Sequence, residues 1–372
     1  MRICRIEPDN KRDIRRFIQF PFQLYKDNPY WVPTLKSEME SVFDRHKHPF
    51  YQTSQADFFI AESEGSVLGR MAVLKNRQYC DYYQKNIGFF YFLDFFDDKQ
   101  ILNPLISTAL EWGRKNHLAE YHATRGFLRA NGVGILVEGF NNLPAMGSPY
   151  NWPYYGPCLE DYGFEKISDL HSGFIVPSYE MPKNVVEAAE RIRNQNGFQV
   201  LKFTHKKELS SWIEQIGIVY NEAFKENPNY YPSTPEEFAL IAKTIYQVAD
   251  PRLVKIIVKG DRIAGFVLAY PNISRALQKT KGNVWPFGWL SILTALKTSR
   301  TIDLNGIGFL PQHQGRGANI LVYAELEKTL RHCKTEYCNL VQVDERNYKS
   351  KSDMDKMGVT WNKRHRLYRL KI

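Results

Sequence analysis

The stretch GFLPQHQGRGANILVYAELEKTL (residues 308–330) joins a strand pattern to a helix pattern through a glycine-bearing turn. We predict that the strand ends at Leu310 and that the turn, residues 312–317, opens directly into a helix. Glycines in the turn permit a positive φ and let a ligand approach the backbone closely. The first N–H groups of the helix and the helix dipole favour an anion, and Arg316 adds a positive charge. The stretch therefore predicts a binding site for a diphosphate.

This turn differs from two other glycine-rich phosphate motifs. A Walker loop continues with Lys and then Ser or Thr after its second glycine, whereas Gly317 is followed by Ala318. A dinucleotide-binding fingerprint needs a third glycine, and here the spacing is Gly-x-Gly alone. The predicted site is therefore an anion-binding turn of another kind.

The patterns on both sides of this turn indicate an internal duplication. Each half reads as strand, helices, hairpin, long strand, helix, strand, helix and strand, although residue-level similarity between the halves is weak. A stretch that is first proline-rich and then has the pattern of a polar helix, residues 177–197, is predicted to be the linker. The predicted domains are residues 1–176 and 198–372.

The individual elements follow from apolar spacing and from Gly, Pro and capping residues. In the first half, we predict strands over 3–6, 57–62, 66–74 and 87–96, and helices over 14–24 and 100–116. In the second half, we predict strands over 198–203, 253–258, 263–268, 301–310, 337–343 and 364–372, and helices over 207–224, 235–248, 318–332 and 348–357.

Composition describes a packed globular chain. Its 372 residues are 43% hydrophobic and 24% charged, which suits two domains with proper cores. The apolar runs reach about ten residues, short of the ~20 that cross a bilayer, and the start lacks a signal-peptide pattern. The five cysteines form neither a CxxC pair nor a Cys/His cluster. We therefore expect a cytoplasmic chain with reduced thiols.

The net charge of +10 lies entirely in the second half. From residue 197 onward there are 27 Lys and Arg against 16 Asp and Glu, and the rest of the chain has 23 against 24. A polyanionic partner should therefore bind the second half, and the candidates are a phosphorylated cofactor, an anionic membrane surface or nucleic acid. The alternative is a basic surface that only aids solubility.

The motif residues resemble the GNAT superfamily of acyl-CoA-dependent N-acyltransferases. The family signature Gln/Arg-x-x-Gly-x-Gly/Ala lies between the fourth strand and the third helix, and Gln312, Gly315 and Gly317 match it. Asn347 followed by Met357-Gly358-Val359 resembles the Asn…Leu-Gly-Phe segment that leads into the last strand. The resemblance implies an α+β (mixed α/β) fold with two tandem GNAT-like domains, each a mixed central sheet flanked by helices. It also implies acyl-CoA as co-substrate, with these binding residues: Phe309, Leu310, Gln312, Gln314, Gly315, Arg316, Gly317 and Ala318.

A closer likeness covers nearly the whole chain. The stretches FPFQLYKDNPYWVP (20–33), GILVEGF (134–140), PYNWPYYGPCLEDYGF (149–164) and PFGWL (286–290) resemble a group of bacterial tandem GNAT-like proteins. Some relatives in that group are implicated in N-acylating a long-chain base during sphingolipid synthesis.

Three features depart from the family pattern. Residues 128–133 lack the carboxylate expected before Gly134, and residues 95–99 stand where the first half would carry a glycine turn. We therefore expect a first domain without a cofactor site that shapes the acceptor cleft. The tyrosine that protonates the leaving thiolate in many GNAT enzymes would fall near Met354, so this general acid is not assigned.

The candidate catalytic residues are Glu345, Asp303 and Asn347. Acyl transfer to an amine needs a group that accepts the ammonium proton, and a partly buried carboxylate can do so directly or through water. Glu345 and Asp303 fit this role, and a surface or helix-capping role is the alternative for each. Tyr348 could donate a proton or simply pack. The histidines lack zinc-ligand spacing, so no metal is expected.

The segment KTKGNVWPFGWLSILTALKTSR (279–300) is aromatic and aliphatic with lysines at both ends. It could line an acyl-chain tunnel, lie at a membrane interface, or be an ordinary helix packed on the sheet.

These observations favour an acyltransferase that moves an acyl group from acyl-CoA, or from acyl-carrier protein, to a primary amine. A lipid amine and peripheral association with an anionic membrane, at its inner face, suit the basic half and the aromatic segment. Two alternatives stay open, namely an aminoacyl-tRNA-dependent transferase and a non-catalytic acyl-CoA-binding protein. Tandem enzymes of the first kind generally lack the intact turn, so nucleic acid is not the expected partner.

Overall fold

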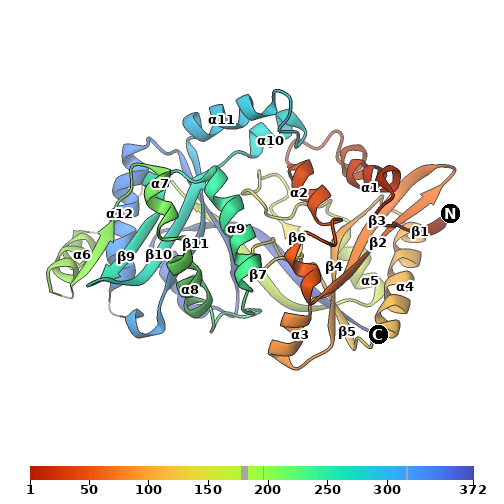
Figure 1. The fold of residues 1–372 in the computed structure, drawn as a ribbon, viewed down its shortest axis with the longest axis horizontal. Helices are drawn as coiled ribbons and strands as arrows, with labels where there is room; N and C mark the ends of the chain where they lie inside the picture. Colours follow the sequence, from red (N-terminus) through yellow and green to blue (C-terminus); the bar gives the residue numbers. More distant parts are fainter. Residues whose placement is uncertain (177–182, 196, 316) are drawn as a thin grey trace. The chain divides into compact units, whose positions relative to one another are not determined.

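A computed structural model of the chain describes residues 1–176, 183–195, 197–315 and 317–372 (Figure 1). The chain forms two compact units. Unit 1 comprises Met1–His171, Ser274–Ser291 and Asn362–Ile372, and unit 2 comprises Ser172–Ile273 and Ile292–Trp361. Each unit is a mixed sheet with helices against it, which confirms the predicted α+β class. The division differs from the predicted domains because two late segments, 274–291 and 362–372, belong to unit 1.

The sheet of unit 1 has the order β1-β2-β3-β4-β5-β13, and β6 also pairs with β13. Neighbours are antiparallel except β4 and β5, which are parallel. The strands are β1 (Arg2–Arg5), β2 (Gln55–Ser63), β3 (Ser66–Lys75), β4 (Ile87–Phe95), β5 (Glu120–Ala123), β6 (Ile135–Glu138) and β13 (Thr360–Lys371). The first two residues of β13 belong to unit 2, and a further strand, β7 (Glu165–Ile175), also carries residues of both units.

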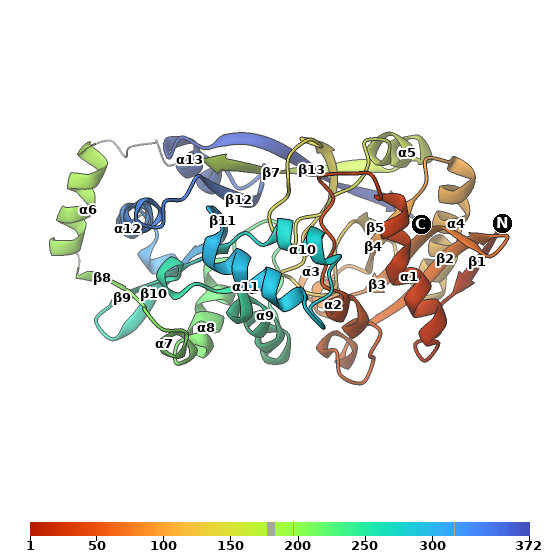
Figure 2. The same cartoon turned by 90° about the horizontal axis from the view of Figure 1, so that it is seen from above.

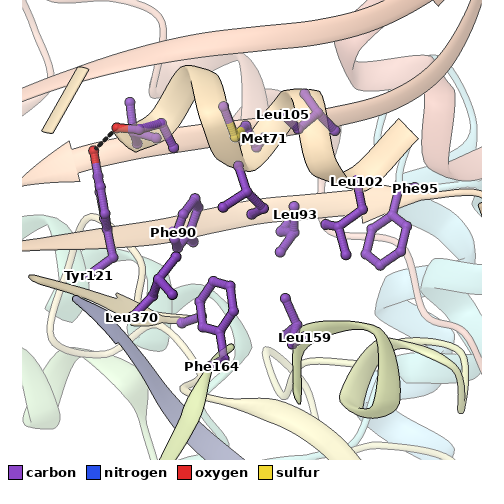
Figure 3. Close-up of a cluster of buried hydrophobic side chains, with 14 of the residues drawn as sticks. Met71, Phe90, Leu93, Phe95, Leu102, Leu105, Tyr121, Leu159, Phe164 and Leu370 are labelled. Atoms are coloured by element: carbon purple, nitrogen blue, oxygen red, sulfur yellow. Dashed lines mark hydrogen bonds between the residues drawn. The ribbon is translucent and has the colours of Figure 1, made fainter. Parts of the chain in front are cut away.

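The core of unit 1 lies between the sheet and α4, as Figure 3 shows. Leu102 and Leu105 are three residues apart on α4, so they share a face and are both fully buried. The hydroxyl of buried Tyr121 donates a hydrogen bond to the Ala109 carbonyl at 2.7 Å. The helices are α1 (Lys11–Leu24), α2 (Lys36–Ser41), α3 (Arg77–Tyr83), α4 (Lys99–Lys115), α5 (Tyr155–Tyr162), α10 (Ser274–Thr280) and the 3₁₀ turn η1 (Pro49–Gln52).

The sheet of unit 2 has the order β12-β11-β10-β9-β8, in which β11 and β12 are parallel and the other pairs antiparallel. The strands are β8 (Phe198–Leu201), β9 (Lys255–Lys259), β10 (Arg262–Pro271), β11 (Thr301–Phe309) and β12 (Tyr337–Asp344). The helices are α6 (Lys183–Gln195), α7 (Lys206–Ser210), α8 (Ile213–Ala223), α9 (Pro235–Val248), α12 (Ala318–His332) and α13 (Tyr348–Lys356), with 3₁₀ turns η2 (Pro251–Leu253) and η3 (Pro311–His313). Helix α11 (Gly288–Thr298) continues from one unit into the other.

One predicted helix, 207–224, is two helices in the structure. Ser210 and Ser211 end α7, and their hydroxyls donate hydrogen bonds to the carbonyls of Lys207 and Glu208 at 2.6 and 2.9 Å. Such bonds compete with the regular helical pattern and break it. The polar part of the predicted linker is helical and forms α6. This helix packs beside α12 (Figure 2), and Arg193 Nη2 lies 2.5 Å from Glu325 Oε1. Linker residues 177–182 and 196 lie outside the described residues.

Candidate active site

Strands β11 and β12 separate at the centre of unit 2. They pair in parallel from Thr301 with Tyr337 to Leu304 with Leu340. Beyond this point β11 continues to Phe309 and β12 to Asp344 without further paired residues, among the residues described. Beyond Leu304 the described residues of β11 are not in register with β12, so an extended ligand can pair with this edge of β11.

A β-bulge marks the start of this separation. Leu268 of β10 pairs with Gly306 while the next residue, Ala269, pairs with Leu304, so Asn305 is the extra residue. Asn305 is exposed, and its side-chain amide donates a hydrogen bond to the Tyr270 hydroxyl at 2.6 Å. Burial raises the pKa of Tyr270 well above its usual value, and the nearby Asp303 carboxylate raises it further. The phenol therefore stays protonated at physiological pH.

The glycine turn follows directly after β11. Gly315 has φ +68° and Gly317 has φ +82°, in the left-handed region that favours glycine. Gly317 is the N-cap of α12, and no described side chain caps that helix. A Cβ on Gly317 would collide with the Ile192 side chain, whereas a Cβ on Gly315 would meet nothing within 4 Å. The turn thus combines an uncapped helix N-terminus with open space beside Gly315, which fits an anionic ligand.

The other residues predicted to bind acyl-CoA belong to the same strand–turn–helix segment. Gln312 and Gln314 are exposed, and Gln314 Nε2 donates to the Phe309 carbonyl at 3.1 Å. Phe309 and Leu310 are half-buried, and Ala318 is buried in the first turn of α12. Arg316 lies outside the described residues. The structure thus brings the described members of the predicted set to one strand–turn–helix junction.

Asp303 is fully buried near the start of β11. Both of its carboxylate oxygens accept hydrogen bonds from the Asn272 amide, at 3.0 and 2.9 Å, and Oδ1 accepts a third from Asn339 at 2.8 Å. Cys338 lies nearby, and burial, aided by the Asp303 charge, raises its pKa to about 12, so this thiol stays protonated. Two amides therefore hold the Asp303 carboxylate away from solvent.

Glu345 and Asn347 lie just after β12. The adjacent Asp344 is buried and accepts bonds from Arg346 Nη2 at 2.8 Å and from Asn229 at 3.1 Å. Asn347 caps α13 by accepting from Ser350 N at 3.1 Å, and its amide donates to Asn227. Glu345 is half-buried between these two anchored residues. The hydrogen bonds of its neighbours fix the backbone that carries the Glu345 carboxylate.

Two tyrosine expectations have clear outcomes. Met354 is buried on α13, so an apolar side chain stands where the family tyrosine was expected. Tyr348 is 78% exposed and therefore does not pack. Sequence reasoning missed the roles of Tyr270, Asn272 and Asn339; the Asn305-Gly306 pair within a strand was the available signal for the bulge.

Unit 1 has a corresponding pair of parallel strands, followed by a helix without the glycine turn. Strands β4 and β5 pair in parallel only from Ile87 with Glu120 to Phe90 with Ala123. The following helix α4 has Asp98 as its N-cap, whose carboxylate accepts a hydrogen bond from Gln100 N at 2.7 Å. An anion of the chain already occupies this helix N-terminus, and it would repel a diphosphate. The expectation that residues 1–176 lack a cofactor site stays a prediction.

Neither a metal cluster nor a membrane-spanning helix is found within the described ranges. They contain no group of three or more His, Cys, Asp or Glu that could hold a metal ion. Within the same ranges, no helix combines the length and apolar character needed to span a bilayer.

The two units, each a mixed sheet with a pair of parallel strands followed by a helix, define a tandem GNAT-fold protein. Solved structures agree: the chain matches a tandem GNAT protein from the clavulanic acid biosynthesis pathway with a TM-score of 0.59 and 12% identity, covering 100% of this chain and 98% of that one. A GCN5-related N-acetyltransferase from Sphaerobacter thermophilus matches with a TM-score of 0.50 and 16% identity, over 100% and 95%. The predicted tandem GNAT fold is therefore confirmed.

Two named proteins are homologous in sequence. The bacterial ceramide synthase of Caulobacter vibrioides is 28% identical over 315 residues, covering 82% of this chain and 80% of the synthase. Protein YghO of Escherichia coli K12 is 24% identical over 375 residues, covering 98% and 94%. No protein-family model matches the sequence.

Proposed function

We propose that this protein is an N-acyltransferase that moves an acyl group from acyl-CoA to the primary amine of a long-chain lipid base. The observation that carries the proposal is the separated β11 edge ending in the uncapped N-terminus of α12. Similarity to a bacterial ceramide synthase supports a lipid amine as the acceptor.

The donor would lie along the β11–turn–α12 junction. The backbone of the turn around Gly315, with the start of α12, suits the diphosphate, and the free edge of β11 over residues 307–310 suits the pantetheine arm. Acyl-carrier protein presents only one phosphate, so the capacity for a diphosphate favours CoA. Bound acyl-CoA supplies a thioester carbonyl whose carbon–sulfur bond breaks as the new carbon–nitrogen bond forms.

The chain would supply a base and fixed dipoles. Glu345 takes the proton that the ammonium must lose before the nitrogen can attack, directly or through water. Backbone N–H groups at the Asn305 bulge, where the register of β11 with β10 shifts and its pairing with β12 ends, would stabilise negative charge on the carbonyl oxygen. Water protonates the leaving thiolate, because buried Met354 cannot.

Asp303 and Asn347 would be positioning residues that do not touch the reacting atoms. The hydrogen bonds between Asp303 and two asparagines tie β11 to β12 and to Asn272, the residue after β10, beside the bulge. Asn347 anchors the segment that carries Glu345. Their task is to hold β11 and Glu345 in place for a base–substrate geometry that tolerates little displacement.

A water-insoluble acceptor places the enzyme at a membrane. We therefore propose a cytoplasmic protein that associates peripherally with the inner face of an anionic membrane, held in part by its basic second half.

Release of free CoA thiol tests the function. Purified protein is mixed with donors from acetyl-CoA to palmitoyl-CoA and either a long-chain amino alcohol in detergent or a small soluble amine. The proposal expects fastest release with a long-chain donor and the lipid amine. A protein that binds acyl-CoA tightly yet releases no thiol with any amine would be a non-catalytic binder, and one that binds tRNA instead would be the transferase alternative.

A further inference from the structure

The segment from Val284 to Leu293 exposes an unusual number of large apolar side chains. Among the described residues, twelve such side chains are strongly exposed, and six of them lie in this segment. Trp285 is 81% exposed and Phe287 is 74% exposed. We call these six residues the aromatic surface: Val284, Trp285, Phe287, Trp289, Leu290 and Leu293. Patches of this kind mark interaction sites.

Helix α11 contributes one face to this surface and buries none of its residues. Trp289 and Leu293 are four residues apart, so they lie on the same side of the helix, and Lys297 follows one turn later. Ile292 and Leu296 are half-buried on the other side, so α11 touches the protein on one face and exposes the other; this argues against a core helix and against a closed tunnel.

The turn before α11 is built rigidly. The backbone N–H of Trp289 donates to the Val284 carbonyl at 2.8 Å, which closes a loop with Trp285 and Phe287 at its tip. Gly288 is required in this loop, because a Cβ there would collide with the Asn283 carbonyl. The backbone that carries the exposed Trp285 and Phe287 is therefore fixed by its own contacts.

The segment is also anchored within unit 1. The Gln278 amide donates to the carbonyls of Pro29 and Trp31, both at 2.9 Å. Lys36 N donates to the Gly282 carbonyl at 3.0 Å. Because this loop is already ordered, it loses little conformational entropy when its exposed side chains bind a partner.

The basic residues around the aromatic surface indicate an anionic partner. Residues 262–302 contain no Asp or Glu, and their basic residues are Arg262, Arg275, Lys279, Lys281, Lys297 and Arg300. All six are exposed, and Arg300 pairs with Glu336. Exposed tryptophan and phenylalanine flanked by lysines suit the headgroup region of a bilayer, where aromatic rings settle and basic residues meet anionic lipid.

We infer that the aromatic surface is a membrane anchor that inserts into an anionic phospholipid bilayer, with Lys279 and Lys281 at the headgroups. The inference rests on the proposed function for its purpose, since it brings the enzyme to a lipid amine. Binding to vesicles is nevertheless measured without any turnover.

Flotation of the full chain with lipid vesicles tests the anchor. Vesicles of phosphatidylcholine alone are compared with vesicles that contain 30% phosphatidylglycerol, at low and high salt. We expect binding to the anionic vesicles, at least a tenfold loss in the Trp285→Ser/Phe287→Ser double variant, and about a fivefold loss for each lysine replaced. The matched control replaces exposed apolar residues elsewhere, Ile218→Ser/Tyr348→Ser, and should bind like wild type.

The outcomes separate the anchor from the activity. Equal flotation of the double variant and wild type would overturn the anchor, as would conversion of a wild-type dimer to a monomer by the double substitution in the absence of lipid. Thiol release with a detergent-dispersed amine should be unchanged in the double variant. If wild type floats but never releases thiol, the proposed function fails while the anchor stands.

Discussion

Gly315 and Gly317 satisfy two different constraints in one turn. Both positions have a positive φ, which favours glycine. At position 317 a Cβ would also collide with Ile192, whereas at position 315 a Cβ would fill space that is open for a ligand. The spacing Gly-x-Gly therefore identified the turn correctly, but the role of Ile192 could not be read from the sequence, since it comes from α6.

The Gly315→Val variant should lose acyl-CoA binding while staying folded. A β-branched side chain fills the space left for the ligand and strains a left-handed residue by roughly 1–2 kcal/mol. Calorimetric titration with CoA measures the loss, and Gly260→Val is the matched control because Gly260 also has positive φ (+59°) and open space. Unchanged CoA affinity in folded Gly315→Val would disprove the binding site.

The Glu345→Gln variant should reduce kcat by about 100-fold or more, because the amide cannot accept the proton. The KM for acyl-CoA should change little, since the donor site is left intact. Steady-state kinetics distinguish the two, with Glu336→Gln on the exposed Arg300 pair as the control. A kcat within threefold of wild type would remove Glu345 from the mechanism.

The Asp303→Asn variant should be destabilised. Its new amide would point donors at the donating amides of Asn272 and Asn339, which costs about 1–3 kcal/mol for a buried group. Thermal unfolding measures the change, with exposed Asp261→Asn as the control. A variant as stable as wild type but without turnover would instead make Asp303 the base.

Among the elements, those with strong local signals were predicted best. Helix α9 begins and ends as predicted, because Thr234 and Glu237 form a reciprocal capping box, with Glu237 N donating to Thr234 at 3.1 Å. Helix α12 also matches its prediction. The hydrogen-bonded group around Asp303 could not be predicted, because its amides lie 31 and 36 residues away along the chain.

We predict that protein stability depends on pH through His48, the N-cap of the η1 turn. Burial lowers the pKa of its cap, His48, from 6.5 to about 4, and the neutral Nδ1 accepts from Phe50 N at 3.3 Å. Between pH 6.5 and 4 only the unfolded state binds the proton, so stability falls as pH falls through this range.

Between pH 7.5 and pH 5, the free energy of unfolding of the His48→Asn variant should therefore fall by about 2 kcal/mol less than that of wild type. Asparagine keeps an acceptor for the Phe50 N–H and does not titrate. Denaturant unfolding at the two pH values measures the difference, and the exposed neighbour His46→Asn should behave like wild type. Equal pH sensitivity in His48→Asn and wild type would contradict the assignment. His365, whose pKa burial also lowers to about 4, keeps its own contribution in all three proteins.

At the scale of the whole molecule, the duplication was readable but the division between units was not. The order of strands and helices repeats along the chain, and this repetition predicted the tandem fold. The last strand looked like the end of the second domain, yet β13 pairs with β5 from Tyr368 with Ala123 to Lys371 with Glu120, in unit 1. Strand pairing over such a separation depends on tertiary packing, for which periodicity carries no signal.

The identity of the product tests the central claim most directly. Full-length protein is incubated with palmitoyl-CoA and a long-chain amino alcohol in mixed micelles, and the lipid product is analysed by mass spectrometry before and after mild alkali. We predict an alkali-stable N-palmitoyl amide that Gly315→Val does not form. The absence of amide, or transfer from acetyl-CoA to small soluble amines alone, would contradict acylation of a lipid amine by this protein.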